Sequence, residues 1–127
     1  MAIVGIGIDL VDLHRVERIM ERHGERALHK FLTAKEIEFC KARANMAPHM
    51  AARIASKEAA YKALQEAPDA RGIGWKEMEV VSGDHGKPTL AFHGKADQAA
   101  RYLGVATAFV SLSHSDTAAA AVVVLQT

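Results

Sequence analysis

The stretch that decides the fold reads Arg53-Ile54-Ala55-Ser56-Lys57-Glu58-Ala59-Ala60-Tyr61-Lys62-Ala63. It lies within a run from Met50 to Leu64 that contains neither glycine nor proline and is rich in alanine, the best helix former. A helix this apolar is usually buried. We therefore predict a buried central helix around which the other elements pack.

This helix carries charges that a buried helix rarely tolerates. Glu58 and Lys62 are four residues apart, so their side chains project from the same face. A carboxylate and an ammonium on a largely buried helix are unfavourable unless they are paired or used. Taken alone, the stretch favours a solvent-facing ion pair between them. A functional role depends on residues elsewhere in the chain.

The N-terminal segment from Ala2 to Asp9 is predicted to be a buried strand. One face of this strand carries Ala2, Val4, Ile6 and Ile8, and the other carries Ile3, Gly5, Gly7 and Asp9. Glycine inside a strand often marks the close approach of a ligand or of another backbone. Asp9 ends this nearly bare face. Because Asp12 is available to cap the following helix, Asp9 has no evident structural role.

A basic amphipathic helix is predicted from Asp12 to His23, ended by Gly24. The arginines on and just beyond it are Arg15, Arg18, Arg22 and Arg26. A solvated, salt-bridged face is the commoner meaning of such a pattern. The alternative is a docking patch for an acidic helix of a partner protein.

The rest of the chain predicts one more helix and then mainly strands. Thr33 and Glu36 form a capping box that begins a helix ending near Ala44, and Asn45 to Pro48 is read as a break. The remaining predicted elements are a loop at 65–74, strands at 75–81 and 89–93 joined by a turn at 82–88, a helix at 96–103, and a hairpin of strands 105–114 and 118–125. This order predicts a single α+β domain over residues 1–127, with a largely antiparallel sheet packed on the long central helix.

Composition narrows the class of protein. The chain has 127 residues, of which only 6% are aromatic, so its core must be built from small side chains, and association into an oligomer would compensate. A net charge of +1 gives no overall attraction to nucleic acid or membranes, so neither is expected as a partner. A single cysteine, no signal peptide and no apolar run of membrane-spanning length lead us to expect a cytoplasmic protein.

The unexplained carboxylates suggest a chemistry. Mg²⁺ takes one or two protein carboxylates and completes its coordination with water and phosphate oxygens. Asp9 and Glu58, with Lys62 one turn away, would suit a diphosphate substrate if the two carboxylates meet, which spacing alone does not show. Motifs for zinc or for a nucleotide-binding loop are missing. Ser113 and His114 are neighbours on one strand and point to opposite faces, so we expect His114 to contact a phosphate or to serve only the hairpin.

Several motifs together carry a family resemblance. They are, in order, Gly5-Ile6-Gly7-Ile8-Asp9-Leu10-Val11, the central stretch from Arg53 to Ala63, Gly86-Lys87-Pro88, and Ser111-Leu112-Ser113-His114-Ser115. Over its whole length the chain resembles the holo-acyl-carrier-protein synthases, the small group of phosphopantetheinyl transferases. The resemblance implies a 4′-phosphopantetheinyl transferase-like fold and a homotrimer whose active sites lie between subunits. It also implies transfer of 4′-phosphopantetheine from coenzyme A to a serine of apo-acyl carrier protein, with release of adenosine 3′,5′-bisphosphate, in support of fatty acid biosynthesis.

The resemblance also implies roles for individual residues. Asp9 and Glu58 match Mg²⁺ ligands, and Lys62 matches a lysine that contacts the diphosphate, so these three form the predicted catalytic set. The residues expected near coenzyme A are Arg53, Lys57, Lys62, Gly86, Lys87, Pro88 and His114. Those expected to meet the acidic carrier protein are Arg15, Arg18, Arg22 and Arg26. The base that accepts the serine proton is either Asp9 or a water activated by the metal.

Two departures from the family pattern stand out. Ile54 replaces the usual aromatic residue, and the loop at 65–74 replaces a Gly-Thr-Gly type turn, with Arg71 as a candidate phosphate contact. Two other functions stay open at this point. One is a binding module that docks acidic helices, and the other is an enzyme that cleaves coenzyme A without a carrier protein.

Overall fold

The structure, a computed structural model, describes all 127 residues apart from the side chain of Asp84. The elements in chain order are β1 (Ile3–Asp12), α1 (Leu13–His23), α2 (Glu25–Phe31), α3 (Ala34–Lys41), α4 (Met46–Ala63), β2 (Met78–Ser82), β3 (Pro88–Phe92), α5 (Gly94–Leu103), β4 (Thr107–His114) and β5 (Ala118–Gln126). Short 3₁₀ turns cover Ala70–Gly72, Trp75–Glu77 and Asp84–Gly86.

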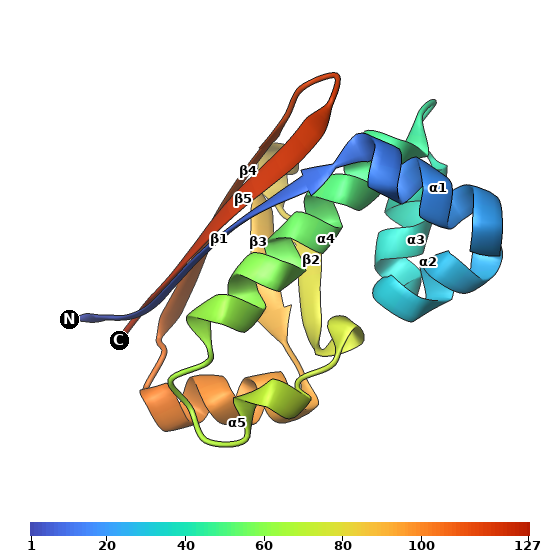
Figure 1. The fold of residues 1–127 in the computed structure, drawn as a ribbon. Coiled ribbons are helices and arrows are strands. Elements are labelled where there is room, and N and C mark those ends of the chain that lie inside the picture. Colours follow the sequence, from blue (N-terminus) through green and yellow to red (C-terminus); the bar gives the residue numbers. More distant parts are fainter.

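The strands form two antiparallel sheets. One has the order β1-β5-β4 and the other is the hairpin β2-β3 (Figure 1). The central helix α4 packs along one face of the three-stranded sheet, with α1, α2 and α3 near one end of the helix and α5 near the other (Figure 1). The predicted α+β class and antiparallel pairing are confirmed, but the strands divide between two sheets.

Helix α4 begins earlier than predicted. Asn45 caps it by accepting a hydrogen bond from the backbone N–H of Ala47 at 3.3 Å. Pro48 lies in the first turn, where the missing N–H of proline would have no intrahelical partner in any case. The break predicted at Asn45 to Pro48 is therefore wrong, because these residues start the helix.

The glycines of β1 allow α4 to approach the strand. A Cβ atom added at Gly7 would lie 1.9 Å from the carbonyl oxygen of Ala59, and one added at Gly5 would lie 2.1 Å from that of Ala63. Any side chain at either position would overlap the helix backbone. The bare face of the strand thus serves contact with another backbone, which is one of the two meanings that strand glycines allow.

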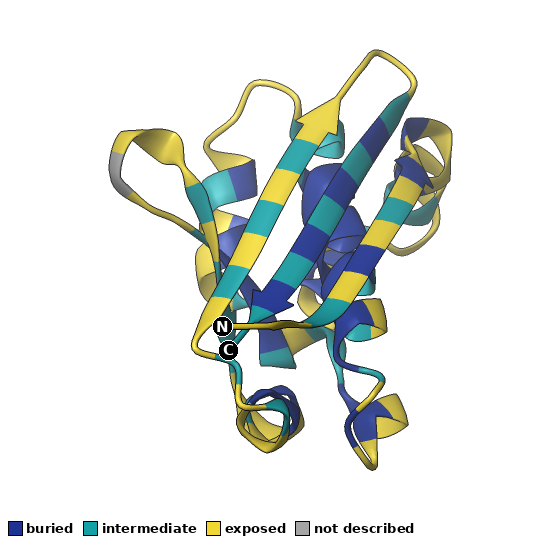
Figure 2. Cartoon of the chain, turned by 90° about the vertical axis from the view of Figure 1, so that its left-hand side faces the viewer, coloured by how far each residue is buried: buried dark blue, intermediate teal, exposed yellow. Residues whose placement is uncertain are grey.

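The opposite face of β1 is open, which contradicts the prediction of a buried strand. Ile6, Ile8 and Leu10 are 65%, 69% and 71% exposed. Figure 2 looks onto this face of the sheet, where exposed residues alternate with more buried ones along β1 and β4, partly buried residues alternate with buried ones along β5, and no helix covers the strands. The sheet therefore has one face in the core and one apolar face in contact with solvent.

The predictions for the other helices are partly confirmed. Asp12 caps α1, and Thr33 and Glu36 form the predicted capping box of α3. Helix α2 was not predicted. It begins directly after Gly24, whose φ of 52° reverses the chain, and it buries Leu28 against the core.

Within the part of the chain that the structure describes, no helix combines the length and hydrophobicity needed to cross a bilayer.

Candidate active site

The site begins where β1 passes over α4. Asp9 lies two residues after Gly7 and so shares its helix-facing side, which lets Glu58 of α4 come beside it. The pKa of Glu58 rises to about 7, first because the group is partly buried and then because the carboxyl group of Asp9 lies beside it. The two carboxyl groups, 49 positions apart in the chain, are therefore neighbours in the folded protein.

Two cations flank the carboxyl pair. The Nζ atom of Lys62 lies 3.1 Å from Oδ1 of Asp9 and donates to the carbonyl oxygen of Ile8 at 3.0 Å. A guanidinium nitrogen of Arg15 lies 3.8 Å from Glu58. Lys62 thus pairs with Asp9 of β1. The ion pair between Glu58 and Lys62 that the i,i+4 spacing favoured is not formed.

The pair fits a divalent cation. Atom Oδ2 of Asp9 is buried and has no hydrogen-bond partner, and the Asp9 carboxylate opposes ionisation of Glu58. A bound Mg²⁺ would satisfy both groups, since this ion needs only one or two protein carboxylates. The described histidine, cysteine and acidic residues form no cluster of three or more that could enclose a metal. This donor set suits an ion that shares its coordination with water and substrate.

A cleft of about 450 Å³ opens beside the carboxyl pair. The residues that line it are Glu58, Tyr61, Lys62, Arg71, Ile73, Trp75 and Met78. Charged groups and apolar side chains are therefore both present on its walls. A substrate that suits it would have an anionic part and an apolar part.

Arg53 and His114 belong to a second cluster. The guanidinium groups of Arg43 and Arg53 each lie 3.9 Å from the ring centroid of Phe39. The ring of His49 lies 5.9 Å from that of Phe39 and 6.0 Å from that of His114. Burial lowers the pKa of His49, and the neighbouring arginines and His114 lower it further. The Nε atom of Arg53 is buried without a hydrogen-bond partner. The cluster is therefore cationic and able to accept an anion.

The single chain does not join this cluster to the carboxyl pair. His114 ends β4 and Asp9 lies on β1, and β5 separates these strands in the sheet. Three members of the cluster, Phe39, Arg43 and His49, were not predicted. The available signal was the spacing of His49 and Arg53, which are four residues apart on one helix face.

The model of the 4′-phosphopantetheinyl transferase superfamily matches residues 5–123. The chain belongs to this superfamily. Among its transferase relatives, the holo-[acyl-carrier-protein] synthase of Maridesulfovibrio salexigens is 44% identical over 98% of both chains.

Solved structures agree with this assignment. The holo-[acyl-carrier-protein] synthase of Helicobacter pylori in complex with coenzyme A is 28% identical with a TM-score of 0.80, covering 95% of this chain and 99% of that one. The corresponding synthase of Bacillus anthracis in complex with coenzyme A (3′,5′-ADP) is 30% identical with a TM-score of 0.75, covering 97% and 96%. The family resemblance expected from the sequence motifs is confirmed.

One predicted cofactor contact of this transferase does not fit its structure. Lys57 is fully buried and lies 2.7 Å from Glu36, which is also fully buried. Its Nζ atom donates to the carbonyl oxygen of Trp75 at 2.9 Å, and the other oxygen of Glu36 accepts from the backbone N–H of Val80. An ammonium so enclosed cannot reach a ligand, and the direct contact with coenzyme A expected for Lys57 is contradicted. Lys57 instead ties α4 to α3 and to the 3₁₀ turn that precedes β2.

The Gly86-Lys87-Pro88 motif of the transferase lies at the tip of the β2-β3 hairpin. Gly86 has a φ of 76° in the 3₁₀ turn, Lys87 is exposed, and Pro88 begins β3. The cleft beside Glu58 is lined by α4, the segment that follows it and the start of β2, not by this tip. Contact between this motif and the same bound molecule would therefore require a second subunit or a movement of the hairpin.

The basic patch of the transferase divides into two parts. Arg15 and Arg26 line a groove of about 530 Å³ between α1 and α2, whose other walls are Ile19, His23, Ala27, Lys30 and Phe31. Arg18 and Arg22 are exposed on α1 but do not line this groove. The groove thus combines positive charge with an apolar floor.

Proposed function

We propose that this protein transfers 4′-phosphopantetheine from coenzyme A to a serine of apo-acyl carrier protein, with Mg²⁺, releasing adenosine 3′,5′-bisphosphate, and so supports fatty acid biosynthesis. The observation that carries the proposal is that Asp9 lies beside Glu58, which lines a cleft with both charged and apolar walls. The names of the relatives, holo-[acyl-carrier-protein] synthases, and their complexes with coenzyme A support the substrate pair.

Asp9, Glu58 and Lys62 would have separate roles in this reaction. Asp9 and Glu58 would hold Mg²⁺, which when bound neutralises phosphate charge and polarises the phosphoanhydride. Lys62, anchored by Asp9 and the carbonyl of Ile8, offers its remaining N–H to the departing phosphate, whose charge grows in the transition state. The nucleophile arrives with the carrier protein. Its proton passes to Asp9 or to a water, the two acceptors that the site offers.

Apolar walls of the cleft would hold the pantetheine arm. Ile73, Trp75 and Met78 line the cleft together with the charged groups at Glu58 and Lys62. Burial of the arm's apolar atoms against them would contribute roughly 25 cal/mol per Å² removed from water. The arm would then orient the diphosphate towards the carboxyl pair.

We also infer that the working enzyme is a homotrimer with its active sites between subunits. The open face of the β1-β5-β4 sheet carries Ile6, Ile8, Leu10 and the 51% exposed Phe109, an apolar surface that a solvated monomer rarely presents. Association of such faces would let the carboxyl pair of one subunit and the cluster around Phe39 of the next act on one molecule of coenzyme A. This arrangement would bring His114 and the cluster that contains Arg53 near coenzyme A, as the family resemblance implies.

The groove between α1 and α2 is the proposed contact for the carrier protein. An acidic helix would meet the positive side chains at its rim, while Ile19 and Phe31 would receive an apolar side chain. Charged rim contacts mainly raise the association rate, and a central apolar contact slows dissociation.

Charge-reversal variants can distinguish the arginines that line this groove from those on the rest of the basic patch. Arg26→Glu is expected to raise the KM for the carrier protein by about tenfold, because it places a negative charge inside the groove. Arg18→Glu, with the same change of charge outside the groove, is expected to have a much smaller effect. Steady-state kinetics at low and high salt measure both, and the difference should shrink as salt screens the charges. Equal effects of the two variants would contradict the groove.

The proposed function is tested by mass spectrometry. Incubation with apo-carrier protein, coenzyme A and Mg²⁺ should add the mass of phosphopantetheine to the carrier, and a carrier with its serine changed to alanine should stay unmodified. A parallel incubation without carrier detects cleavage of coenzyme A alone. Absence of the mass shift on a carrier that another transferase modifies would refute the proposal, and carrier-free cleavage would favour a hydrolase.

A further inference from the structure

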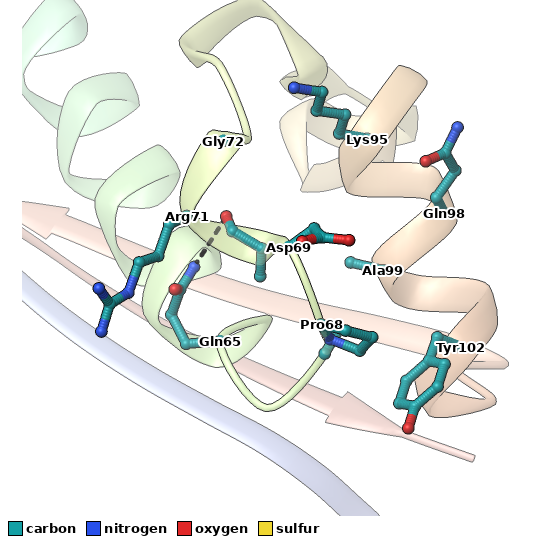
Figure 3. Close-up of a pocket in the computed structure, with 11 residues that line it drawn as sticks. Gln65, Pro68, Asp69, Arg71, Gly72, Lys95, Gln98, Ala99 and Tyr102 are labelled. Carbon is teal, nitrogen blue, oxygen red and sulfur yellow. Dashed lines mark hydrogen bonds between the residues drawn. The ribbon is translucent and has the colours of Figure 1, made fainter.

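Side chains at the end of α4 and just beyond it hold the short turn that follows, and we call these contacts the clamp. The hydroxyl of Tyr61 donates to the carbonyl oxygen of Arg71 at 3.0 Å. The side-chain amide of Gln65 donates to the carbonyl oxygens of Tyr61 and Ala70, at 2.9 and 3.2 Å, and the bond to Ala70 is the dashed line in Figure 3. The 3₁₀ turn Ala70–Gly72 is thus held by the side chain of Tyr61 in the last turn of α4 and by that of Gln65 just beyond the helix, which fixes the position of the Arg71 backbone.

The clamp directs Arg71 into the cleft of the carboxyl pair. Figure 3 shows a different pocket, between this turn and α5, and in it the side chain of Arg71 points away from Lys95 and Tyr102 of α5. On its other side Arg71 lines the cleft that contains Glu58 and Lys62. Two cationic side chains therefore face one cleft.

The two cations differ in their partners. Lys62 is already bound to Asp9 and to the carbonyl oxygen of Ile8. Arg71 is exposed and takes part in none of the salt bridges that the described residues form. A guanidinium presents its N–H donors in a planar fork that matches two oxygens of one phosphate. An unpaired arginine whose backbone is held in place on the wall of a cleft is therefore suited to hold an anion.

We propose that Arg71 binds a phosphate group of the nucleotide substrate, and that Tyr61 and Gln65 position it for this contact. The inference rests on the proposed function, since coenzyme A supplies the phosphate. The diphosphate and the 3′-phosphate of coenzyme A share the chemistry that Arg71 recognises. An experiment with and without the 3′-phosphate tells them apart.

The test is calorimetric binding of coenzyme A and of 3′-dephospho-coenzyme A in the presence of Mg²⁺, without carrier protein. Arg71→Ala is expected to weaken binding of coenzyme A by about 10- to 100-fold, and Arg71→Lys by less, because lysine keeps the charge but loses the fork. Arg101→Ala is the matched control, an exposed arginine of α5 that pairs with Asp97 at 2.8 Å, and it should bind like the wild type.

Each outcome has a defined meaning. If Arg71→Ala weakens both ligands equally, the contact is to the diphosphate, and if only coenzyme A is weakened, it is to the 3′-phosphate. If the affinity of Arg71→Ala for coenzyme A is within twofold of the wild-type value, this inference is overturned while the proposed function stands. A wild-type protein that binds neither ligand overturns both.

The positioning role of Tyr61 has its own readout. Tyr61→Phe keeps the ring and removes the donor to Arg71, so binding of coenzyme A should weaken by about 2- to 10-fold. In the Arg71→Ala background the same change should have no further effect, because the group it positions is gone. Additive effects of the two changes would contradict a role through Arg71. Far-UV circular dichroism and a urea titration confirm that both variants are folded.

Discussion

Glu58→Gln is expected to lower kcat/KM for transfer from coenzyme A by about 10²- to 10³-fold while leaving the metal-free protein at least as stable as the wild type. The activity falls because one of two anionic metal ligands becomes a neutral amide. The stability does not fall, because the substitution removes a carboxylate that lies against Asp9 and is partly buried. A residue retained for stability alone would show the opposite pattern.

The same variant should change how stability depends on pH. Since the pKa of Glu58 is raised from its ordinary value of 4.5 to about 7, the folded state binds more protons than the unfolded state between these values. The free energy of unfolding of the metal-free wild type should therefore fall as the pH rises through this window, by roughly 1–3 kcal/mol. Glu58→Gln should abolish this fall. Urea titrations from pH 4.5 to 8 measure it.

Added Mg²⁺ supplies a control that does not depend on activity. A cation at the carboxyl pair favours the ionised form of Glu58, so Mg²⁺ should raise the wild-type Tm more at pH 8 than at pH 5.5. Glu66→Gln, an exposed change just beyond α4, should behave like the wild type in every measurement. A Glu58→Gln protein that kept both near-normal turnover at low Mg²⁺ and the Mg²⁺-dependent rise in Tm would contradict the proposed metal site.

The carboxyl pair could be predicted from the sequence because each half carries a local signal. Asp9 follows strand glycines and has no evident structural role in the sequence, while Glu58 lies on an apolar helix of alanines, where a carboxylate is unfavourable unless it is paired or used. Once α4 packs onto the bare face of β1, the two acids meet. The sequence could not say whether a ligand or a helix filled that bare face, because Gly7 provides space for either.

Lys57 and the cluster around Phe39 show the limit of reading one element at a time. Lys57 adjoins Glu58 in the chain, and its burial depends on Glu36, a partner from α3 that no spacing in the central motif predicts. Such a buried pair is seldom identifiable before the helices are packed. The same holds for Arg43, whose position over the ring of Phe39 arises where α3 ends.

Ile8→Asp is expected to dissociate the proposed trimer and to remove nearly all transfer activity. Ile8 is 69% exposed and stands near the middle of β1, opposite Val122 of β5, on the open face of the sheet. Burial of such a side chain in an interface contributes about 1.5–3 kcal/mol, and an unpaired carboxylate in its place opposes association in each subunit. Tyr102→Asp is the matched control, because Tyr102 is 68% exposed on α5 and lies outside this sheet.

Sedimentation velocity would follow the mass of each variant, and circular dichroism would show that Ile8→Asp remains folded. The expected result is a trimeric wild type, a trimeric Tyr102→Asp and a monomeric Ile8→Asp. A wild type that sediments as a monomer at working concentration, with full activity, would contradict the interfacial site. Loss of activity in a variant that remains trimeric would assign Ile8 another role.

Complementation then tests whether each active site is shared between subunits. Asp9→Asn inactivates the carboxyl pair, and Arg43→Ala/His114→Ala removes exposed members of the cationic cluster, so each variant alone should have little activity. After the two are unfolded together and refolded as a mixture, about one quarter of interfaces should combine an intact carboxyl pair from one subunit with an intact cluster from its neighbour. Activity should return towards that fraction. If the mixture is no more active than either variant alone, the carboxyl pair and the cationic cluster do not combine across subunits. The proposal of an active site shared between subunits would then be wrong.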